Sequence, residues 1–227
     1  MIIVTGASGG LGQGLLKELA GLDSIVGTYE SHHPLSVAGD VHLVRLDVTD
    51  VKSVNEFVRA IRADATRITL VNLAGVSGDG LSVTLPLSDW EHVLAVNLTG
   101  SFLMSRSIVR LMMRERWGRI INVGSVVSRL GRPGASAYAS AKGGVISMTQ
   151  CLAQEYAPHN VTVNCLRLGY FSEGLIHKLS EKDLMRAMDR IAMRRLGTPA
   201  DLAGAIKYLI DADYVTGAVL DLDGGLI

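Results

Sequence analysis

Residues that crosslink or bridge small proteins are scarce in this sequence. It has two cysteines, Cys151 and Cys165, without CxxC spacing, and its six histidines show no metal-ligand spacing. We therefore expect no disulfide framework and no metal site, and we interpret both cysteines as small hydrophobic core residues. A chain of 227 residues needs no such help, because a domain of this size can bury roughly 70% of its unfolded surface.

Charge of one sign and long apolar runs are also lacking. Lys and Arg together number 22, as do Asp and Glu, so the formal net charge is 0 and gives no global attraction to nucleic acid or to an anionic membrane. The longest uncharged apolar stretches, such as 93–105, are shorter than a membrane span, and a strand pattern begins at once, without a signal peptide. The sequence predicts a cytoplasmic protein with no nucleic-acid and no membrane partner.

Strand and helix patterns alternate along the whole chain. The expected strands are short β-branched or apolar runs at 2–4, 24–29, 41–46, 68–73, 119–123, 161–166 and 215–222. Helical patterns lie between them, with long helices at about 88–116 and 137–157, one begun by Thr49 or Asp50, and one begun by Thr198. Such alternation predicts a single α/β domain over 1–227 with a Rossmann-type, doubly wound, mainly parallel seven-stranded sheet covered by helices on both faces.

A glycine-rich turn follows the first strand. Gly6, Gly10 and Gly12 let the backbone turn tightly and approach a ligand, and the helix that follows directs unpaired N–H groups and its positive dipole end at the same place. A pyrophosphate suits this environment. The spacing is GxxxGxG, not GxGxxG, so a turn that only packs a strand against a helix is the alternative interpretation.

Polar residues and glycines follow several of the predicted strands, where a parallel sheet binds its ligands. Glu30 comes 20 residues after Gly10, at the place where a Rossmann site has an acid for the adenosine ribose hydroxyls. Asp47 could meet an adenine amino group or could serve as an acid at a helix N-terminus. The residues expected to share one crevice are Gly6, Asp47, Asn72, Ser125 and Gly169.

Tyr138 and Lys142 are four residues apart in a predicted helix, so the phenol and the ammonium share one face. A solvent-exposed pair is the alternative. Ser125 at the end of a strand and Asn97 in the preceding long helix favour a catalytic site, in which Ser125 polarises a substrate oxygen. Proton transfer by Tyr138 near neutral pH requires its pKa of about 10 to be lowered by roughly 2 units, and we expect Lys142 and a nicotinamide ring to lower it.

These residues carry a resemblance to the short-chain dehydrogenase/reductase family over the whole chain. Its motifs correspond to Thr5-Gly6-xxx-Gly10-x-Gly12, Asp47-Val48, Asn72-Leu73-Ala74-Gly75 and the tetrad Asn97, Ser125, Tyr138 and Lys142. The resemblance implies oxidoreductase chemistry with a nicotinamide cofactor and a water held by Asn97. The cofactor contacts that it implies are Gly6, Ser8, Gly9, Gly10, Leu11, Gly12, Glu30, Asp47, Val48, Asn72, Ala74, Gly75, Tyr138, Lys142, Gly169 and Phe171.

Within that family, the segments 117–127, 134–144 and 216–225 are similar to the 3-oxoacyl-acyl-carrier-protein reductases. This likeness implies a ketone substrate carried on acyl-carrier protein and a homo-oligomer, a tetramer or a dimer. The alternatives are the same chemistry on a sugar, polyol or other biosynthetic intermediate, and a nucleotide-sensing protein without turnover. Four arginines could dock an acidic carrier or form a solvated helix end: Arg110, Arg114, Arg116 and Arg119.

The chain departs from the family pattern at Leu73, Leu168 and Glu173, where the family usually has asparagine, proline and threonine. A glutamate facing a pyrophosphate would be repelled, so we expect Glu173 to point elsewhere and Ser172 to take the threonine's place. The polar, amphipathic segment at about 173–196 is expected to form a lid that closes over cofactor and substrate.

The cofactor's charge state depends on two positions. Family members that use NADPH commonly have an arginine just before the second motif glycine or a basic residue after the second strand, and here these places hold Gly9 and Glu30. A 2′-phosphate beside a carboxylate costs on the order of 1 to 3 kcal/mol. The sequence therefore favours NAD(H), while Ser31-His32-His33 keeps NADP(H) open.

Overall fold

The computed structural model describes residues 1–33, 39–63, 65–174, 176 and 181–227. Its centre is a seven-stranded sheet in the order β3-β2-β1-β4-β5-β6-β7, with every neighbouring pair of strands parallel. The strands are β1 Ile2–Val4, β2 Ile25–Tyr29, β3 Val41–Arg45, β4 Thr69–Asn72, β5 Gly118–Ser125, β6 Val161–Leu168 and β7 Val219–Leu222. The predicted doubly wound parallel sheet is therefore confirmed.

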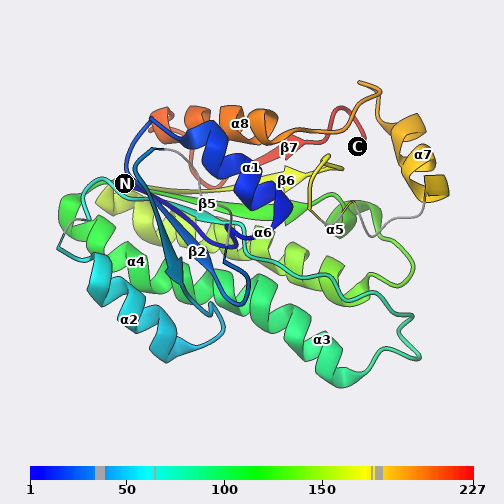
Figure 1. The fold of residues 1–227 in the computed structure, drawn as a ribbon, viewed down its shortest axis with the longest axis horizontal. Helices are drawn as coiled ribbons and strands as arrows, with labels where there is room; N and C mark the ends of the chain where they lie inside the picture. The colour runs from blue at the N-terminus through cyan, green and yellow to red at the C-terminus, as the bar shows by residue number, and fades with distance from the viewer. Residues whose placement is uncertain (34–38, 64, 175, 177–180) are drawn as a thin grey trace.

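Helices cover both faces of this sheet (Figure 1). One face carries α1 Gly10–Leu19 and α8 Pro199–Asp211, and the other carries α2 Val51–Ile61, α4 Ser101–Glu115 and α6 Ser136–Tyr156. The remaining elements are α3 Leu87–Leu94, the π-helix η1 Ala95–Gly100, α5 Val127–Leu130, the 3-10 helix η2 Ala157–His159 and α7 Glu181–Arg190. In the described ranges, no helix combines the length and the apolar character needed to cross a bilayer.

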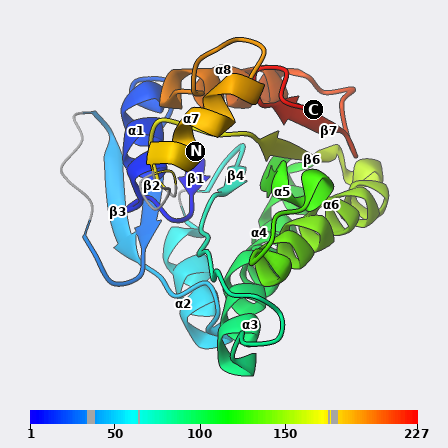
Figure 2. The same cartoon turned by 90° about the vertical axis from the view of Figure 1, so that its right-hand side faces the viewer.

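Two apolar cores hold the layers together. Ile3, Leu70 and Ile120 face the α2, α4 and α6 side, whereas Val4 and Leu166 face the α1 and α8 side. All five side chains are buried because the central strands are covered on both faces. From β1 the strand order continues through β2 to β3 at one edge of the sheet, and from β4 it continues through β5 and β6 to β7 at the other edge. A crevice therefore opens at the carboxyl ends of β1 and β4. Figure 2 looks onto this edge, over which α7 lies.

One predicted helix and three predicted strands differ in extent from the structure. The long helix expected at 88–116 contains the π-helical turn η1, in which hydrogen bonds from the Ser101 and Ser105 side chains to backbone carbonyls accompany the widened turn. β5 and β6 each run two residues further than expected, to Ser125 and Leu168. β7 begins only at Val219, because the positive φ of Gly217 (74°) turns the chain before the strand starts.

Two side-chain expectations were wrong. Cys165 is buried, as expected for a core residue, but Cys151 is exposed on the outer side of α6. Arg119 is not part of a surface basic patch. It is 3% exposed, its guanidinium lies over the ring of Trp117, and its Nε donates to the carbonyl oxygen of Ile210.

The helices α1 and α8 pack so closely at Gly14 that a side chain does not fit between them. A Cβ on Gly14 would overlap the ring of Pro199, the first residue of α8, whereas a Cβ on Gly204 in the same helix would meet nothing within 4 Å. The hydroxyl of Thr198 caps α8, and the Asp201 carboxylate completes a capping box, so the helix end cannot easily shift.

This packing predicts opposite effects of one substitution at two helical glycines. Gly204→Ala should raise the free energy of unfolding by about 0.5 to 1 kcal/mol, because alanine restricts the unfolded chain. Gly14→Ala should lower it by about 1 to 3 kcal/mol, because the methyl group forces α1 away from Pro199. Urea-induced unfolding measures both changes. If the free energy of unfolding changed in the same direction in the two variants, the proposed packing of Gly14 against Pro199 would be contradicted.

Candidate active site

A cavity of about 670 Å³ opens at the carboxyl edge of the sheet. Almost all of the residues expected at the site line it: Gly6, Ser8, Gly9, Gly10, Leu11, Gly12, Glu30, Asp47, Val48, Ala74, Gly75, Ser125, Tyr138, Lys142, Gly169 and Phe171. Asp79, His92 and Arg132 also line the cavity and were not expected there. Asp79 and Arg132 lie in two loops without a strand or helix pattern, whereas His92 lies in α3, so only their position between predicted site elements could have pointed to them.

The glycine turn packs directly against the end of β4. A Cβ on Gly6, whose φ is 72°, would lie 2.7 Å from Cα of Ala74, and a Cβ on Gly12 would overlap the carbonyl oxygen of Gly6. The Thr5 hydroxyl accepts hydrogen bonds from the backbone N–H groups of Leu73 and Ala74, each at 3.0 Å. The glycines are thus needed for strand packing and, at the same time, expose backbone to the cavity.

Glu30 and Asp47, the two acids beyond β2 and β3 that line the cavity, have different surroundings. Glu30 is exposed just beyond β2, and its carbonyl oxygen accepts from Nε of Arg45. Oδ1 of Asp47 accepts from the backbone N–H and the hydroxyl of Thr49, at 2.8 and 2.7 Å. Asp50, and neither Asp47 nor Thr49, caps α2. Asp47 comes three residues before this cap, and its carboxylate fixes the turn beside the cavity, while its contact with an adenine stays a prediction.

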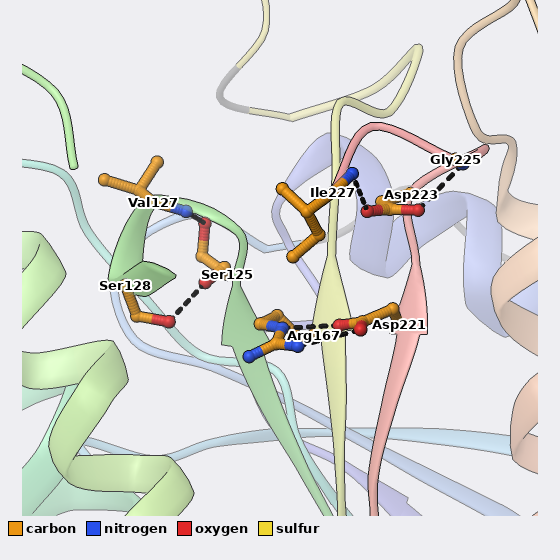
Figure 3. A network of polar contacts seen from close by, with 8 residues as sticks. All are labelled: Ser125, Val127, Ser128, Arg167, Asp221, Asp223, Gly225 and Ile227. Atoms are coloured by element: carbon orange, nitrogen blue, oxygen red, sulfur yellow. Dashed lines mark hydrogen bonds and ion pairs between the residues drawn. The ribbon is translucent and has the colours of Figure 1, made fainter. Parts of the chain in front are cut away.

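Ser125, at the end of β5, is held by its own loop (Figure 3). Its hydroxyl oxygen accepts from the backbone N–H of Val127 at 3.3 Å, and the Ser128 hydroxyl donates to its carbonyl oxygen at 2.6 Å. A side-chain hydrogen bond joins it to Tyr138. Beside this strand, Arg167 of β6 and Asp221 of β7 form an ion pair that ties the neighbouring strands together.

Lys142 lies one turn beyond Tyr138 on α6 and is 3% exposed. Its Nζ donates to the carbonyl oxygen of Val123 at 2.8 Å and lies 5.7 Å from the centre of the Tyr138 ring. The expected side-by-side arrangement of phenol and ammonium is therefore present, with both groups lining the cavity.

Asn97 lies in the π-helical turn η1 and is fully buried. Its Nδ2 donates to the carbonyl oxygens of Val76 and Val93, at 2.8 and 2.9 Å, while Oδ1 has no hydrogen-bond partner among the described residues. A Cβ on Gly75 would lie 2.7 Å from this Oδ1 and 3.6 Å from Nζ of Lys142. The absence of a side chain at Gly75 thus leaves space where an amide oxygen and an ammonium face each other.

Asn72 does not line the cavity, contrary to the expectation of a cofactor contact. Its Nδ2 donates to Oδ1 of Asn122 at 2.8 Å, to the Ser105 hydroxyl at 3.0 Å and to the Ser101 carbonyl oxygen at 3.3 Å. The side chain is 2% exposed and turned into the protein. It joins β4 and β5 to α4, directly after η1, and so supports the position of Asn97.

Burial changes the proton affinities of Tyr138 and Lys142. It raises the pKa of Tyr138 to about 12, with the Ser125 hydrogen bond and then Arg132 acting against this rise. It lowers the pKa of Lys142 to about 8, with Cys165 acting in the opposite direction. Without a cofactor, desolvation of the phenolate outweighs the nearby positive charges, so the expected lowering of the Tyr138 pKa by Lys142 and a nicotinamide ring together stays a prediction.

Glu173 lies where we did not expect it. A Cβ on Gly10 would lie 3.2 Å from Oε2 of Glu173 and 3.0 Å from the backbone nitrogen of Gly174. The carboxylate therefore faces the glycine turn, while Ser172, proposed to take the threonine's place, does not line the cavity. Of the expected lid at 173–196, residues 175 and 177–180 lie outside the described residues, and its closure stays a prediction.

The cavity fits a nicotinamide dinucleotide. It extends from Glu30 beyond β2, past exposed backbone of the glycine turn, to Ser125 and Tyr138 at the other end. A Cβ on Gly75 would enter the space beside Asn97 and Lys142, and at Gly10 the carboxylate of Glu173 approaches the glycine turn. The described residues contain no group of three or more His, Cys, Asp or Glu that could hold a metal ion.

Comparison with known proteins decides the family. The short chain dehydrogenase family profile matches residues 1–184. The chain belongs to the short-chain dehydrogenase family. Nodulation protein G of a Rhizobium species (strain N33) is 39% identical over 233 residues, covering 99% of this chain and 95% of that protein. The 3-oxoacyl-[acyl-carrier-protein] reductase of Thermotoga maritima is 37% identical over 237 residues, covering 99% and 96%.

Solved structures agree with this assignment. A crystal structure of a provisionally assigned gluconate dehydrogenase from Agrobacterium tumefaciens matches with a TM-score of 0.92 and 28% identity, covering 100% of this chain and 95% of that one. This short-chain dehydrogenase is therefore an NAD(P)-dependent oxidoreductase that acts on alcohol or carbonyl groups, and the proteins similar to it include 3-oxoacyl-[acyl-carrier-protein] reductases and a provisionally assigned gluconate dehydrogenase.

The buried ammonium of Lys142 should cost stability at neutral pH. A fall in pKa from 10.5 to about 8 corresponds to about 3 kcal/mol. Lys142→Met removes this cost but also a hydrogen bond of about 1 kcal/mol, so the variant should unfold with a free energy about 1 to 3 kcal/mol higher than wild type at pH 7.

The difference should shrink between about pH 8 and 10.5, because in this window the unfolded chain holds more protons on the lysine and wild type gains stability as pH rises. Urea-induced unfolding at pH 7 and pH 10 measures this. The exposed Lys17→Met on α1 is the control, because it removes an ammonium that lies in solvent and not a buried one. A Lys142 variant less stable than wild type at pH 7 would refute the prediction.

Proposed function

We propose that this short-chain dehydrogenase interconverts a ketone and a secondary alcohol with Tyr138 as proton donor and acceptor, and that its substrate is a 3-oxoacyl thioester carried on acyl-carrier protein. The observation that carries the reaction is the convergence of Ser125, Tyr138 and Lys142 in one cavity, with the Oδ1 of Asn97 turned toward Lys142. The thioester substrate is supported by the names of several relatives at 33 to 37% identity.

The bound nicotinamide cofactor supplies or accepts the hydride. On the protein side, Ser125 donates a hydrogen bond to the substrate oxygen, and in the reducing direction Tyr138 gives that oxygen its proton. Because burial opposes a phenolate at Tyr138, the proton must be replaced at once. Lys142 can do this near neutral pH, since its pKa of about 8 lets it both carry and release a proton.

Asn97 completes the proposed proton path. Its Oδ1 faces the space beside Gly75 toward Nζ of Lys142, and a water there could accept from Lys142 and donate to Asn97. A protein that only senses nucleotides has no physical need for these four side chains in one place, so the geometry argues against the non-catalytic alternative.

A sugar acid or polyol is the second candidate substrate, and one contact favours it. Nη2 of Arg132 donates to Oδ1 of Asp79 across the two loops that line the cavity near Tyr138. Such a pair suits carboxylate and hydroxyl groups on a small polar substrate. The structural likeness to the provisionally assigned gluconate dehydrogenase points the same way.

For the cofactor we propose NAD(H) over NADP(H), held by the glycine turn, Glu30, Asp47 and Val48. We also propose a homo-oligomer, a tetramer or a dimer, built on the helices that carry Asn97 and Tyr138. An acyl-carrier protein would meet the arginines that remain exposed at the end of α4: Arg110, Arg114 and Arg116.

The reaction is tested by Tyr138→Phe. A panel of ketones and alcohols, including acyl thioesters, sugars and sugar acids, is first assayed by nicotinamide absorbance with the wild type, and the best substrate decides between the two candidates. With it, kcat of the variant should fall by about 10²- to 10⁴-fold, because the proton donor is lost while the ring still packs. The Kd of the cofactor should stay close to wild type.

Tyr156→Phe, on the same helix but outside the cavity, is the matched control and should keep full activity. Retention of more than about a tenth of wild-type kcat by Tyr138→Phe would remove the proton-donor assignment, because loss of a general acid costs at least about 10²-fold.

Glu30 predicts the cofactor preference. Wild type should have a kcat/KM for NADH roughly 5- to 150-fold above that for NADPH, since the 2′-phosphate meets a carboxylate. Glu30→Arg should move the ratio toward NADPH. Both ratios are measured at pH 7.5. A tenfold preference of wild type for NADPH would mean that His32 and His33 bind the phosphate, and an unchanged ratio in the variant would mean that Glu30 never meets the ribose.

A further inference from the structure

The first turn of α1 has no acidic or capping side chain of its own. Gly9 is the N-cap residue, it makes no side-chain hydrogen bond, and the first turn contains no Asp or Glu. The backbone N–H groups and the positive dipole end of this helix therefore face the cavity without an acid from the same helix. An acidic group brought from elsewhere in the chain would be stabilised here.

Glu173 brings such a group from the segment after β6. Its Oε2 lies 3.2 Å from the place that a Cβ of Gly10, the first residue of α1, would take. Glu173 and the glycine turn line the same cavity. The carboxylate thus lies at the helix N-terminus where the structure offers its backbone to a phosphate group.

The chain just before Glu173 is firmly held. The N–H of Ser172 donates to the carbonyl oxygen of Gly197 at 2.8 Å, and the N–H of Gly197 donates to that of Tyr170 at 2.9 Å. Phe171 is 5% exposed, and a Cβ on Gly197 would lie 2.9 Å from its ring. Glu173 therefore projects from an anchored point, and its carboxylate lies beside the first turn of α1.

We propose that Glu173 is an internal competitor for the diphosphate of the cofactor and thereby sets the affinity of this site for dinucleotides. A carboxylate and a diphosphate are both anions, and one helix N-terminus cannot stabilise both at once. The attraction that holds Glu173 on α1 in the free protein is therefore subtracted from the binding free energy of any ligand with a diphosphate. Ligands without phosphate escape this cost.

The proposal is tested by Glu173→Gln, which keeps the shape of an exposed side chain and removes its charge. Isothermal titration compares ADP-ribose, which has the diphosphate, with adenosine, which has none. The Kd of ADP-ribose should fall about three- to tenfold, while the Kd of adenosine stays unchanged. Glu18→Gln removes a carboxylate from an exposed position on α1 outside the cavity and should change neither value.

A second measurement follows the free protein. Without ligand, Glu173→Gln should lower Tm by about 1 to 3 °C, because α1 loses the acid at its N-terminus. With saturating ADP-ribose this deficit should disappear. An unchanged Kd of ADP-ribose in Glu173→Gln would overturn the proposal, since the carboxylate would then turn away at no cost. A higher Kd would also overturn it, since Glu173 would then help to hold the ligand.

The proposal rests on the cofactor binding that the family shares and is independent of the proposed substrate and of Tyr138. If ADP-ribose binds and responds to Glu173→Gln while Tyr138→Phe stays active, only the proposed reaction fails. If neither the wild type nor Glu173→Gln binds ADP-ribose, the diphosphate site itself is refuted, and the proposed competition with it.

Discussion

The hydroxyl of Thr5 makes the contact on which the site depends. It accepts hydrogen bonds from the N–H groups of Leu73 and Ala74 and so joins the end of β1 to the end of β4. These are the two neighbouring strands from which the strand order continues in opposite directions. That junction brings the glycine turn against Ala74, and only residues without side chains fit there. The glycine turn at α1 and the proposed catalytic groups beyond Gly75 are thus positioned by one short stretch of backbone.

The proposed catalytic pair, Tyr138 and Lys142, lowers the stability of the folded chain through the buried ammonium of Lys142. Lys142 and Tyr138 lie where burial opposes the charged form of each, and the two pKa values move toward and away from neutrality, respectively. The sheet supplies what holds them there: a carbonyl of β5 for the ammonium, and Ser125 at the end of the same strand for the phenol. Burial of the ammonium lowers the free energy of unfolding at neutral pH, and packing in the two apolar cores offsets this loss.

The sheet and the grouping of residues at its carboxyl edge could be predicted from the hydrophobic periodicity of each segment and from the alternation of strands and helices along the chain. Both can be read directly from the sequence. The errors share another cause. The direction of the Asn72 amide and the approach of Glu173 to Gly10 both depend on contacts between segments far apart in the chain. The π-helical turn at Asn97 likewise leaves no mark in the spacing of apolar residues.

The two cysteines differ in a way that has a practical consequence. Cys165 is buried, and burial raises the pKa of its thiol to about 11, whereas Cys151 lies exposed on α6. A thiol-reactive dye would therefore attach to the native chain at Cys151 alone, since the reactive species is a solvent-accessible thiolate. Modification of Cys165 would begin only when the sheet opens, so the number of labels per chain would report the rate of global opening without any engineered probe.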